Sequence, residues 1–555
     1  MSAPAIHRWD REAVLVAQLA ACVSFFAFLF YLRHGDVLLY GDAVAHTNIA
    51  RRVFDSRTPG LLQLGTVWLP LPHLLIVPFV IIDRMWQSGI GGSIPSLIAY
   101  ILGIAGIFRL VRGQLSLHSE ATVSARVAAW LAAGIYAANP NLIYMQTTAM
   151  TEPLYLALFI WAVVHFSEFA QGASSTDLGE KAGVSSSLVK SGFCLMGACL
   201  TRYDGWFLAA ALGFAALFVI FRSPSDGKML RSAFMKFVLL AVAAPVLWVT
   251  YNTVVYRNPL EFSNGPYSAK GIERKTSVPG SPPHPGTHNL VEAANYLLKS
   301  GELNLANGSW GRIWVLALLV GVVLAMIRDR RLWPLLLLGV PLPFYMLSIA
   351  YGGVPIFIPT WWPYTRYNVR YGLELLPAFA VFTVLAAYFI AGWFAGAKQK
   401  AAVVIAFAVL VIGSYAFIWR DPICYQEAWI NSRTRTALEA ELASNFKKLP
   451  RDATFLMYLG DHVGALQRAG IPLRRVINEG NHRTWKQPTD PDGLWERALE
   501  NPGKYADYVI VSDGDQVSLH VQKKQLSAIA VIHVSGQQPV TIYWTHPPND
   551  SPVLR

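Results

Sequence analysis

The stretch AVLVAQLAACVSFFAFLFYL, residues 13 to 32, contains no charged residue and ends in a run rich in aromatic side chains. An α-helix rises 1.5 Å per residue, so about 20 apolar residues cross a hydrocarbon core roughly 30 Å thick. The stretch is too long and too aromatic for the core of a signal peptide, and no convincing small-residue cleavage site precedes a soluble domain. We therefore interpret it as a permanent membrane anchor.

Similar apolar stretches recur along most of the chain. Hydrophobic residues make up 54% of the 555 residues and charged residues only 14%, which is typical of a membrane protein. We therefore expect a mainly α-helical, polytopic bundle of about eleven transmembrane helices. The expected spans are residues 14–32, 93–111, 122–138, 153–170, 189–201, 205–222, 236–256, 311–327, 332–350, 371–392 and 401–419.

The basic residues of the short loops predict the orientation of the bundle, because lysine and arginine favour the cytoplasmic side. They occur in every second loop, for example in RDRR at 328–331. The N-terminus is therefore expected in the cytoplasm and the C-terminus outside, and compact loops favour a bacterial inner membrane. A crossing by residues 69–82 would break the alternation, so we expect that stretch to lie along the membrane surface.

The chain is expected to have two domains. Residues 1–424 form the transmembrane domain, with long external loops at 33–92 and 257–310, and residues 425–555 form an external soluble α/β domain, because charged residues become frequent there. The stretch 270–290 is rich in proline, glycine and serine and is expected to be irregular. In the soluble domain we expect helices at 430–447 and 461–470, strands at 454–460 and 506–513, and a hairpin of 528–535 with 540–546.

Several classes of protein find no support in the sequence. The net charge of +12 is spread over loops, so no compact basic domain indicates a nucleic-acid partner. Four cysteines, of which three lie within expected spans, give no disulfide framework. Motifs for nucleotide hydrolysis and zinc proteolysis are absent from the sequence.

The segment LLYGDAVAHTNIARRVF, residues 38 to 54, directly follows the first span. Apolar residues return at helical spacing from Ala43 to Phe54, which predicts a helix lying in the membrane interface. Asp42 would cap or precede the first turn of this helix, and helix capping is the structural alternative to a functional role.

This segment resembles the first external loop of the GT-C superfamily of polytopic glycosyltransferases, which includes the protein O-mannosyltransferases and the aminoarabinose transferase of lipid A. The resemblance lies in the acidic Asp42, the helix ending in Arg51 and Arg52, and the proline-broken VWLPLPHLLIVPFV at 67–80. It continues in QTTAMTEPLYLALFIWA at 146–162 and GACLTRYDGWFLAAA at 197–211. The resemblance covers the transmembrane part in order, and some members also carry a soluble external tail.

The resemblance implies transfer of a sugar from a polyprenyl-phosphate donor to an acceptor, with inversion at the anomeric carbon. Asp42 would act as the general base. Glu152 would be a second acidic residue facing the cavity, where it orients the acceptor, shares a cation with Asp42 or caps its helix. Charge on the leaving lipid phosphate needs cations placed in advance. The candidates for that role are Arg51, Arg202, Arg366 and Arg370.

Other candidates also have structural alternatives. Asp204 either belongs to the substrate site or simply neutralises Arg202, and His46 and His73 either contact substrate or are structural. In IPTWWPYTRYNVRYGLE, 358–374, WWPY is similar to the WWDYG signature of oligosaccharyltransferases, but proline replaces the aspartate. Tyr364 belongs either to the substrate site or to an interfacial aromatic belt. Arg366, Arg370 and Glu374, each one helical turn apart, form a stripe expected to bind phosphate and to pair internally.

No cofactor is predicted, although a divalent cation between Asp42 and Glu152 stays open, and neither histidine indicates a metal site. The alternative function is a transporter or flippase of lipid-linked sugars. Transporters tend to have matched halves and interrupted helices near the middle of the membrane. Here the acidic residues cluster at helix ends on one side, which favours the transferase.

Overall fold

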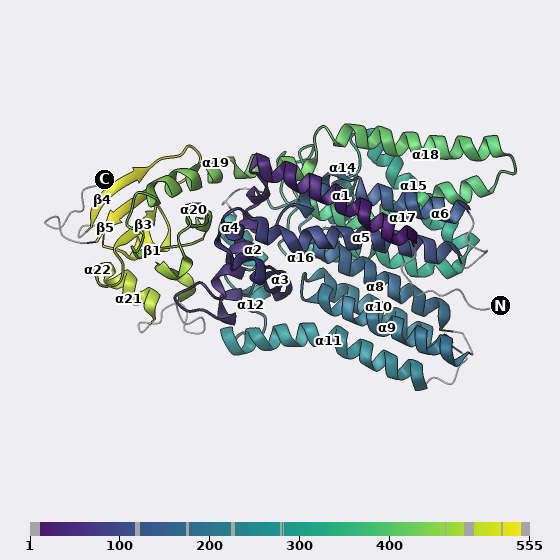
Figure 1. Cartoon of the computed structure of the whole chain (residues 1–555), viewed down its shortest axis with the longest axis horizontal. Coiled ribbons are helices and arrows are strands. Elements are labelled where there is room, and N and C mark those ends of the chain that lie inside the picture. The colour runs from purple at the N-terminus through teal and green to yellow at the C-terminus, as the bar shows by residue number, and fades with distance from the viewer. Residues whose placement is uncertain are drawn as a thin grey trace.

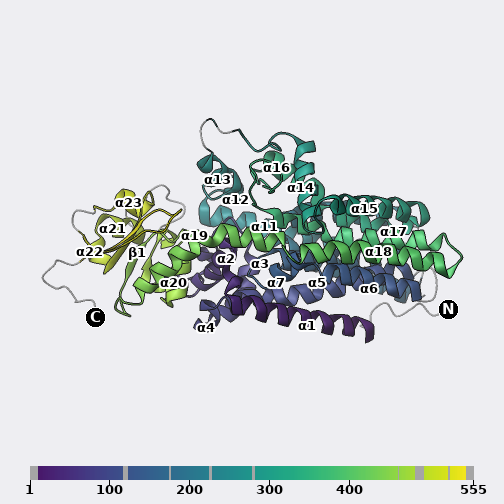
Figure 2. The same ribbon diagram turned by 90° about the horizontal axis from the view of Figure 1, so that it is seen from above.

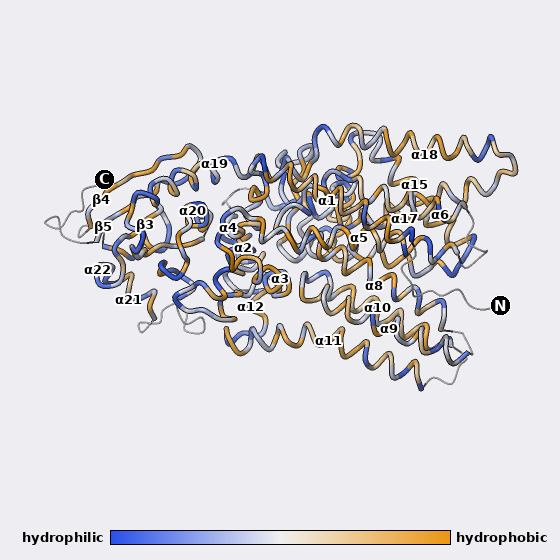
Figure 3. Tube along the Cα trace, in the orientation of Figure 1, coloured by the Kyte–Doolittle hydropathy of each residue, from blue (hydrophilic) through white to orange (hydrophobic). Residues whose placement is uncertain are grey.

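The chain forms a long helical bundle with a smaller α/β domain at one end (Figure 1). This computed structural model describes residues 11–116, 123–173, 177–223, 228–277, 280, 282–460, 462–481, 493–522 and 526–545. Apolar residues dominate the bundle helices, whereas hydrophilic residues are concentrated in the C-terminal domain and at helix ends (Figure 3). The polar and apolar parts of the sequence are therefore separated along the long axis of the molecule.

Within the described residues, nine helical stretches are long and apolar enough to cross a membrane. They are α1 (Arg11–His34), α5 (Ile90–Ser116), α8 (Glu152–Gly172), α10 (Asp204–Arg222), α11 (Lys228–Tyr256), α15 (Ser309–Arg328), η3 with α16 (Arg330–Gly339, Pro341–Tyr351), η4 with α17 (Val369–Leu375, Leu376–Gly392), and α18 with α19 (Ala397–Ile418, Ile423–Phe446). Two more of the expected spans are helical, namely α6 (Val123–Ala137) and α9 (Leu178–Cys199). The polytopic fold is confirmed, and eleven crossings remain a prediction.

Burial separates central helices from peripheral ones. In the apolar windows of α5, α8 and α17 most residues are buried, while α1, α11, α15 and α18 bury a small share. The peripheral helices expose large apolar side chains such as Phe26 (68%), Leu239 (71%) and Ile412 (68%). Such an exposed apolar surface is expected of helices that face lipid.

Short elements connect the bundle to the C-terminal domain, and they correct one expectation. They are η1 (Asp36–Leu38), α2 (Gly41–Arg52), η2 (Leu61–Leu64), α3 (Pro70–Val80), α4 (Asp83–Gln87) and α7 (Pro140–Gln146). We expected the polar face of the interfacial helix α2 to be open to water. It is buried against the C-terminal domain, where Asn48 donates a 2.7 Å hydrogen bond to Gln467. Asp42 does not cap α2: Tyr40 holds the N-cap position and Asp42 lies in the first turn.

The apolar stretch 69–82 folds into α3, which has 11 residues. At 1.5 Å per residue it is too short to cross the bilayer, in line with the expected surface position.

The second long loop contains α12 (Glu261–Asn264), α13 (Ala269–Thr276) and α14 (Leu290–Leu303). The expectation that residues 270–290 are irregular is wrong for the first of them, because the Ser268 hydroxyl accepts from the Gly271 N–H and caps α13. His284 further along packs against Tyr296 and Phe357. Residues 278, 279 and 281 of this stretch lie outside the described residues.

The C-terminal domain is built on a five-stranded sheet in the order β2-β1-β3-β5-β4. Its elements are β1 (Phe455–Met457), α20 (Val463–Ala469), η5 (Leu473–Arg475), β2 (Val476–Ile477), η6 (Glu479–Asn481), α21 (Leu494–Glu500), α22 (Pro502–Tyr505), β3 (Tyr508–Ser512), α23 (Gln516–His520), β4 (Ser527–Ile532) and β5 (Val540–Trp544). The expected strands and the antiparallel β4–β5 hairpin are confirmed, and β2 was not expected. Residues 461 and 546, at the edges of an expected helix and strand, lie outside the described residues.

Helix α19 links the two parts of the molecule (Figure 2). It begins at Ile423, ahead of the expected start at residue 430, and continues without a break to Phe446. Its first turns are buried in the bundle, where Cys424 and Glu427 are almost inaccessible. The expected domain boundary at 424/425 therefore falls within one continuous helix.

Candidate active site

Charged side chains from five helical elements meet at the end of the bundle nearest the C-terminal domain. Arg370, on η4, lies at the centre and pairs with three carboxylates through three different nitrogens. Its Nη2 lies 2.7 Å from Asp42 Oδ2, its Nε 3.0 Å from Glu152 Oε1 and its Nη1 2.8 Å from Glu427 Oε1. The guanidinium thus joins α2, α8 and α19 at one point.

Arg202, in the turn just before α10, forms the second centre of the cluster. Its nitrogens lie 3.2 Å from carboxylate oxygens of Glu152, Asp204 and Glu374. Its Nη2 also donates to the Tyr345 hydroxyl at 2.7 Å. The structure therefore shows the pairing of Arg202 with Asp204, and Glu152 Oε1 connects the two arginines into one network.

Negative charge exceeds positive charge in this cluster. Two guanidinium groups face five carboxylates, an excess of three formal negative charges. Four of the carboxylate side chains are at most 2% exposed, whereas that of Asp42 is 37% exposed. Both arginines are paired with carboxylates, and Asp42 is the most exposed member of the cluster.

The stripe expected from Arg366 to Glu374 is not formed as predicted. Asn368 has a left-handed backbone (φ 57°), and η4, which follows it, is a 3₁₀ helix. Since such a helix has three residues per turn, Arg370 and Glu374 point in different directions. Arg370 faces Asp42 while Glu374 faces Arg202. Arg366 lies before Asn368 and outside the helix, and its Nε is buried without a hydrogen-bond partner.

The aromatic residues of that segment lie on the surface. Tyr364 is 69% exposed and Trp362 39% exposed, while Trp361 packs against Tyr296. Among the described residues, no contact brings the Tyr364 side chain to the cluster, and its exposed position agrees with an aromatic belt.

The two candidate histidines form a buried pair. His46 Nδ1 lies 2.8 Å from His73 Nε2, and the Trp68 ring packs on His46. Burial lowers the pKa of His46 to about 3, with a further contribution from Arg202 and Arg370, and burial lowers the pKa of His73 well below its usual value. Both rings are therefore neutral at pH 7, and one donates its N–H to the other.

Arg51 is not brought to the cluster. Its Nε pairs with Asp55 at 2.7 Å, its Nη2 with Asp83 at 2.6 Å, and its Nη1 donates to the carbonyl of Val80. All of its nitrogens are occupied by these groups, and its guanidinium packs over Trp86. Arg51 therefore ties α2 to the junction of α3 and α4.

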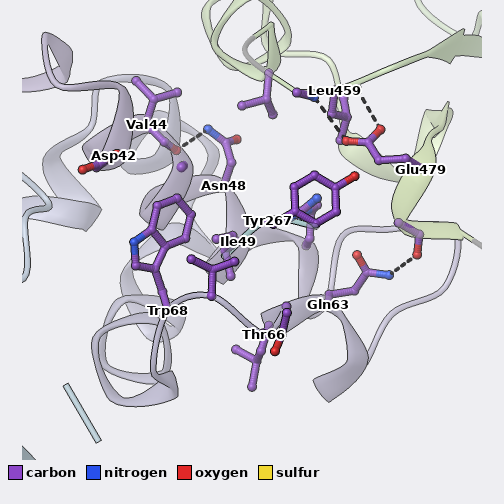
Figure 4. Close-up of a pocket in the computed structure, with 18 of the residues that line it drawn as sticks. Asp42, Val44, Asn48, Ile49, Gln63, Thr66, Trp68, Tyr267, Leu459 and Glu479 are labelled. Carbon is purple, nitrogen blue, oxygen red and sulfur yellow. Dashed lines mark hydrogen bonds between the residues drawn. The ribbon is translucent and has the colours of Figure 1, made fainter. Parts of the chain in front are cut away.

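A cavity of about 500 Å³ opens beside Asp42, between the bundle and the C-terminal domain. Figure 4 shows Asp42 and Trp68 on the bundle side and Leu459 and Glu479 on the opposite side. One face of α2 lines it, from Asp42 in the first turn to Arg52 in the last. The aromatic residues in the lining are Trp68, Tyr256, Tyr267 and Tyr458.

Possible metal ligands do not gather within the described residues, where no group of three or more His, Cys, Asp or Glu is placed to hold a metal ion. The position between Asp42 and Glu152, where a divalent cation was left open, is taken by the guanidinium of Arg370.

Two residues of this region were missed by the sequence analysis. Glu427 was assigned to the soluble domain, although an acidic residue within the apolar ICYQEAWI that follows the last span was a signal for a buried partner. Arg52 was noted as the end of a helix but not as a member of the site.

Comparison with known proteins gives similarity of structure only: no family model and no curated protein matches the sequence. ArnT from Cupriavidus metallidurans bound to undecaprenyl phosphate is 15% identical, with a TM-score of 0.58 over 97% of this chain and 99% of that chain. Its apo structure gives 15% identity and a TM-score of 0.55 over 95% and 97% of the two chains.

The chain has the ArnT fold. The fold expected from the GT-C resemblance, a polytopic helix bundle with a C-terminal sheet domain, is thereby confirmed. The archaeal oligosaccharyltransferase AglB from Archaeoglobus fulgidus, in complex with an inhibitory peptide and a dolichol-phosphate, also matches at 13% identity over 98% of this chain and 75% of that chain, with a TM-score of 0.47.

Proposed function

We propose that the protein is a membrane glycosyltransferase that moves a sugar from a polyprenyl-phosphate donor to a hydroxyl group of a lipid, glycan or protein. One observation carries the proposal: Asp42 is the partly exposed carboxylate of a buried ionic cluster, and it lines a cavity of about 500 Å³. The shared fold with ArnT, solved with undecaprenyl phosphate, supports a lipid-phosphate donor. The proposed location is the external face of a bacterial inner membrane.

In the proposed reaction the acceptor hydroxyl attacks the anomeric carbon and gives its proton to Asp42. The new bond joins the acceptor oxygen to the anomeric carbon, and the bond from that carbon to the phosphate oxygen breaks with its electron pair left on the phosphate. The anomeric centre inverts because attack and departure occur on opposite faces. The 2.7 Å hydrogen bond from Arg370 orients the carboxylate of Asp42.

Glu152 is proposed to act through the two arginines. It is 1% exposed and shares Oε1 between Arg370 and Arg202, so it fixes the guanidinium that in turn fixes Asp42. Its second oxygen is buried without a hydrogen-bond partner. Among the other proposed binding residues, Arg366 keeps a role as a contact to the donor, since its Nε is also unpartnered.

The alternative, a flippase or transporter of lipid-linked sugars, predicts charged groups near the middle of the membrane. Asp42, Glu152 and Asp204 instead lie at the first turns of their helices. These carboxylates therefore lie at one end of the bundle, beside a cavity that the C-terminal domain covers. This position favours a transferase over a transporter that moves its substrate through the bundle.

The test uses purified protein in nanodiscs, a panel of polyprenyl-phosphate sugars and a cell-envelope extract as the source of acceptor, with release of free lipid phosphate as the readout. We expect one or more donors to be turned over by the wild type and not by Asp42→Asn. Turnover by Asp42→Asn at the wild-type rate would refute the assignment of the base. Movement of labelled donor between leaflets of a vesicle, without release of lipid phosphate, would support the flippase instead.

A further inference from the structure

We propose that Arg52, at the opposite end of α2 from Asp42 in the lining of the cavity, binds the phosphate group of the lipid-linked donor. The polyprenyl chain of the donor then extends out of the cavity through an apolar opening formed by Leu62, Tyr267 and Ile272. This inference rests on the proposed function and names the donor subsite within it. It assigns to Arg370 and Arg202 a different task, that of holding the carboxylates.

The first step concerns Arg370. In an inverting displacement the general base and the leaving group lie on opposite faces of the anomeric carbon, with the sugar ring between them. Arg370 is hydrogen-bonded to Asp42 itself at 2.7 Å, so it lies on the side of the base. It therefore cannot also hold the phosphate that departs from the far side. Arg202 is surrounded by three carboxylates at 3.2 Å, which would repel a phosphate.

The second step is that Arg52, unlike Arg370 and Arg202, is not paired with a carboxylate of the described residues. It forms no ion pair with any residue that the structure describes, and its Nε is buried without a hydrogen-bond partner. Burial lowers its pKa, while the charge of Glu479 acts in the opposite direction. Glu479 is itself engaged by the backbone N–H groups of Leu459 and Gly460. Arg52 as a whole is partly buried, and a buried donor such as its Nε is costly unless an acceptor binds it.

The third step is the spacing along α2. Asp42 and Arg52 both line the cavity and are ten residues apart on α2. At 1.5 Å per residue, their Cα atoms are separated by about 15 Å along the axis. Both side chains reach into the same space, which leaves room for a sugar ring between the carboxylate and the guanidinium. This spacing is compatible with a base at Asp42 and a leaving phosphate at Arg52.

The fourth step is the opening of the cavity. Leu62, Tyr267 and Ile272 line it and are also 49%, 41% and 47% exposed, so they form an apolar rim. This rim lies at the end of the span α11, because Tyr251 of α11 donates to the carbonyl of Leu61 and Tyr256 lines the cavity. An apolar opening at the end of a membrane span suits a lipid chain and not a water-soluble phosphate.

The test compares wild type, Arg52→Gln and Arg52→Lys with Arg57→Gln, which makes the same charge change at an exposed position of the same loop. Binding of undecaprenyl phosphate to the protein in nanodiscs is measured, with undecaprenol and inorganic phosphate as probes that each lack one half of the ligand. We expect Arg52→Gln to weaken binding of undecaprenyl phosphate about 10- to 100-fold, the range for a lost charge-assisted hydrogen bond. Arg52→Lys should lose less, and Arg57→Gln and undecaprenol binding should be unchanged.

Two results would overturn the inference while leaving the proposed function intact. One is equal binding of undecaprenyl phosphate by wild type and Arg52→Gln, in a wild type that releases lipid phosphate from a donor. The other is binding of inorganic phosphate as tight as that of undecaprenyl phosphate, which would indicate a soluble anion. A wild type that neither binds undecaprenyl phosphate nor releases it from any donor would refute the proposed function, and this inference with it. If Arg52→Gln fails to fold, Arg52→Lys decides by the same readouts.

Discussion

Asp42 and Glu427 both pair with Arg370, but only Asp42 is proposed to take part in the reaction. Neutralising each carboxylate in turn therefore tests whether Asp42 has a catalytic or a structural role. Asp42 and Glu427 lie 2.7 and 2.8 Å from this guanidinium, so Asp42→Asn and Glu427→Gln each remove one ion pair of similar geometry. The side chain of Asp42 is 37% exposed and lines the cavity, whereas that of Glu427 is 1% exposed and does not. We expect Asp42→Asn to lose rate but little stability, and Glu427→Gln to lose stability but little rate.

For Asp42→Asn the rate of lipid-phosphate release should fall about 10²- to 10⁴-fold, the usual contribution of a general base. The free energy of unfolding should change by less than about 1 kcal/mol, because the pair is partly solvated and Arg370 keeps Glu152 and Glu427. For Glu427→Gln the free energy of unfolding should fall by about 3 kcal/mol, since a buried charge loses a partner. Its rate should stay within about 10-fold of wild type, because Asp42 is intact.

The assay measures release of lipid phosphate for the rate, and tryptophan fluorescence during denaturant unfolding in detergent for the stability. If Asp42→Asn were as destabilised as Glu427→Gln while keeping its rate, Asp42 would be a structural partner of Arg370 and the mechanism would be wrong.

Three further predictions concern the surroundings of the site. Arg51→Met removes the ion pair with Asp55, which is fully buried, and should lower the free energy of unfolding by about 3 kcal/mol. The KM for donor should not change. Burial lowers the pKa of His46 to about 3, so the stability gained from the neutral ring is complete above about pH 6.5 and is lost on acidification. That loss should reach about 2 kcal/mol between pH 7 and pH 5, and unfolding of His46→Gln should show a smaller difference. A methyl group at Gly372 would collide with the backbone of Ser300 and displace η4, so Gly372→Ala should lose stability and rate together, whereas Gly392→Ala, which meets open space, should lose neither.

The sequence predicted the bundle well because its physical basis is local. Each span is a continuous apolar stretch whose length alone fits the bilayer. Glu152 was predicted for a related reason, since a carboxylate at the start of such a stretch is costly without a partner or a task. Asp42 was predicted from its position after the first span and from the GT-C resemblance.

The partners themselves could not be predicted, because they depend on distant parts of the chain. Asp42 and Arg370 are 328 positions apart, and nothing in either segment indicates that one faces the other. The same limit explains α2: its apolar spacing fits an interfacial helix, but Gln467 and α20 cover the face that was expected to be polar and open.

Local geometry explains the remaining error in the site. The spacing of Arg370 and Glu374 is that of neighbours on an α-helix, and the sequence does not show that a 3₁₀ helix forms there after the left-handed Asn368. Three residues per turn send the two side chains to different partners. A pattern read with the wrong helical period therefore gives the right residues with the wrong contacts.

The unbroken helix α19 limits how the two parts of the molecule move against each other. Its first turns carry Glu427, which forms an ion pair with Arg370. Its last turn contacts the sheet, where the ring of Phe446 packs against that of Phe455. If the C-terminal domain swung away from the bundle, α19 would pull Glu427 with it and disturb Arg370, which contacts the proposed base Asp42. We therefore expect substrates to enter the cavity from the side, past the proposed apolar rim at Leu62, while the C-terminal domain stays in place.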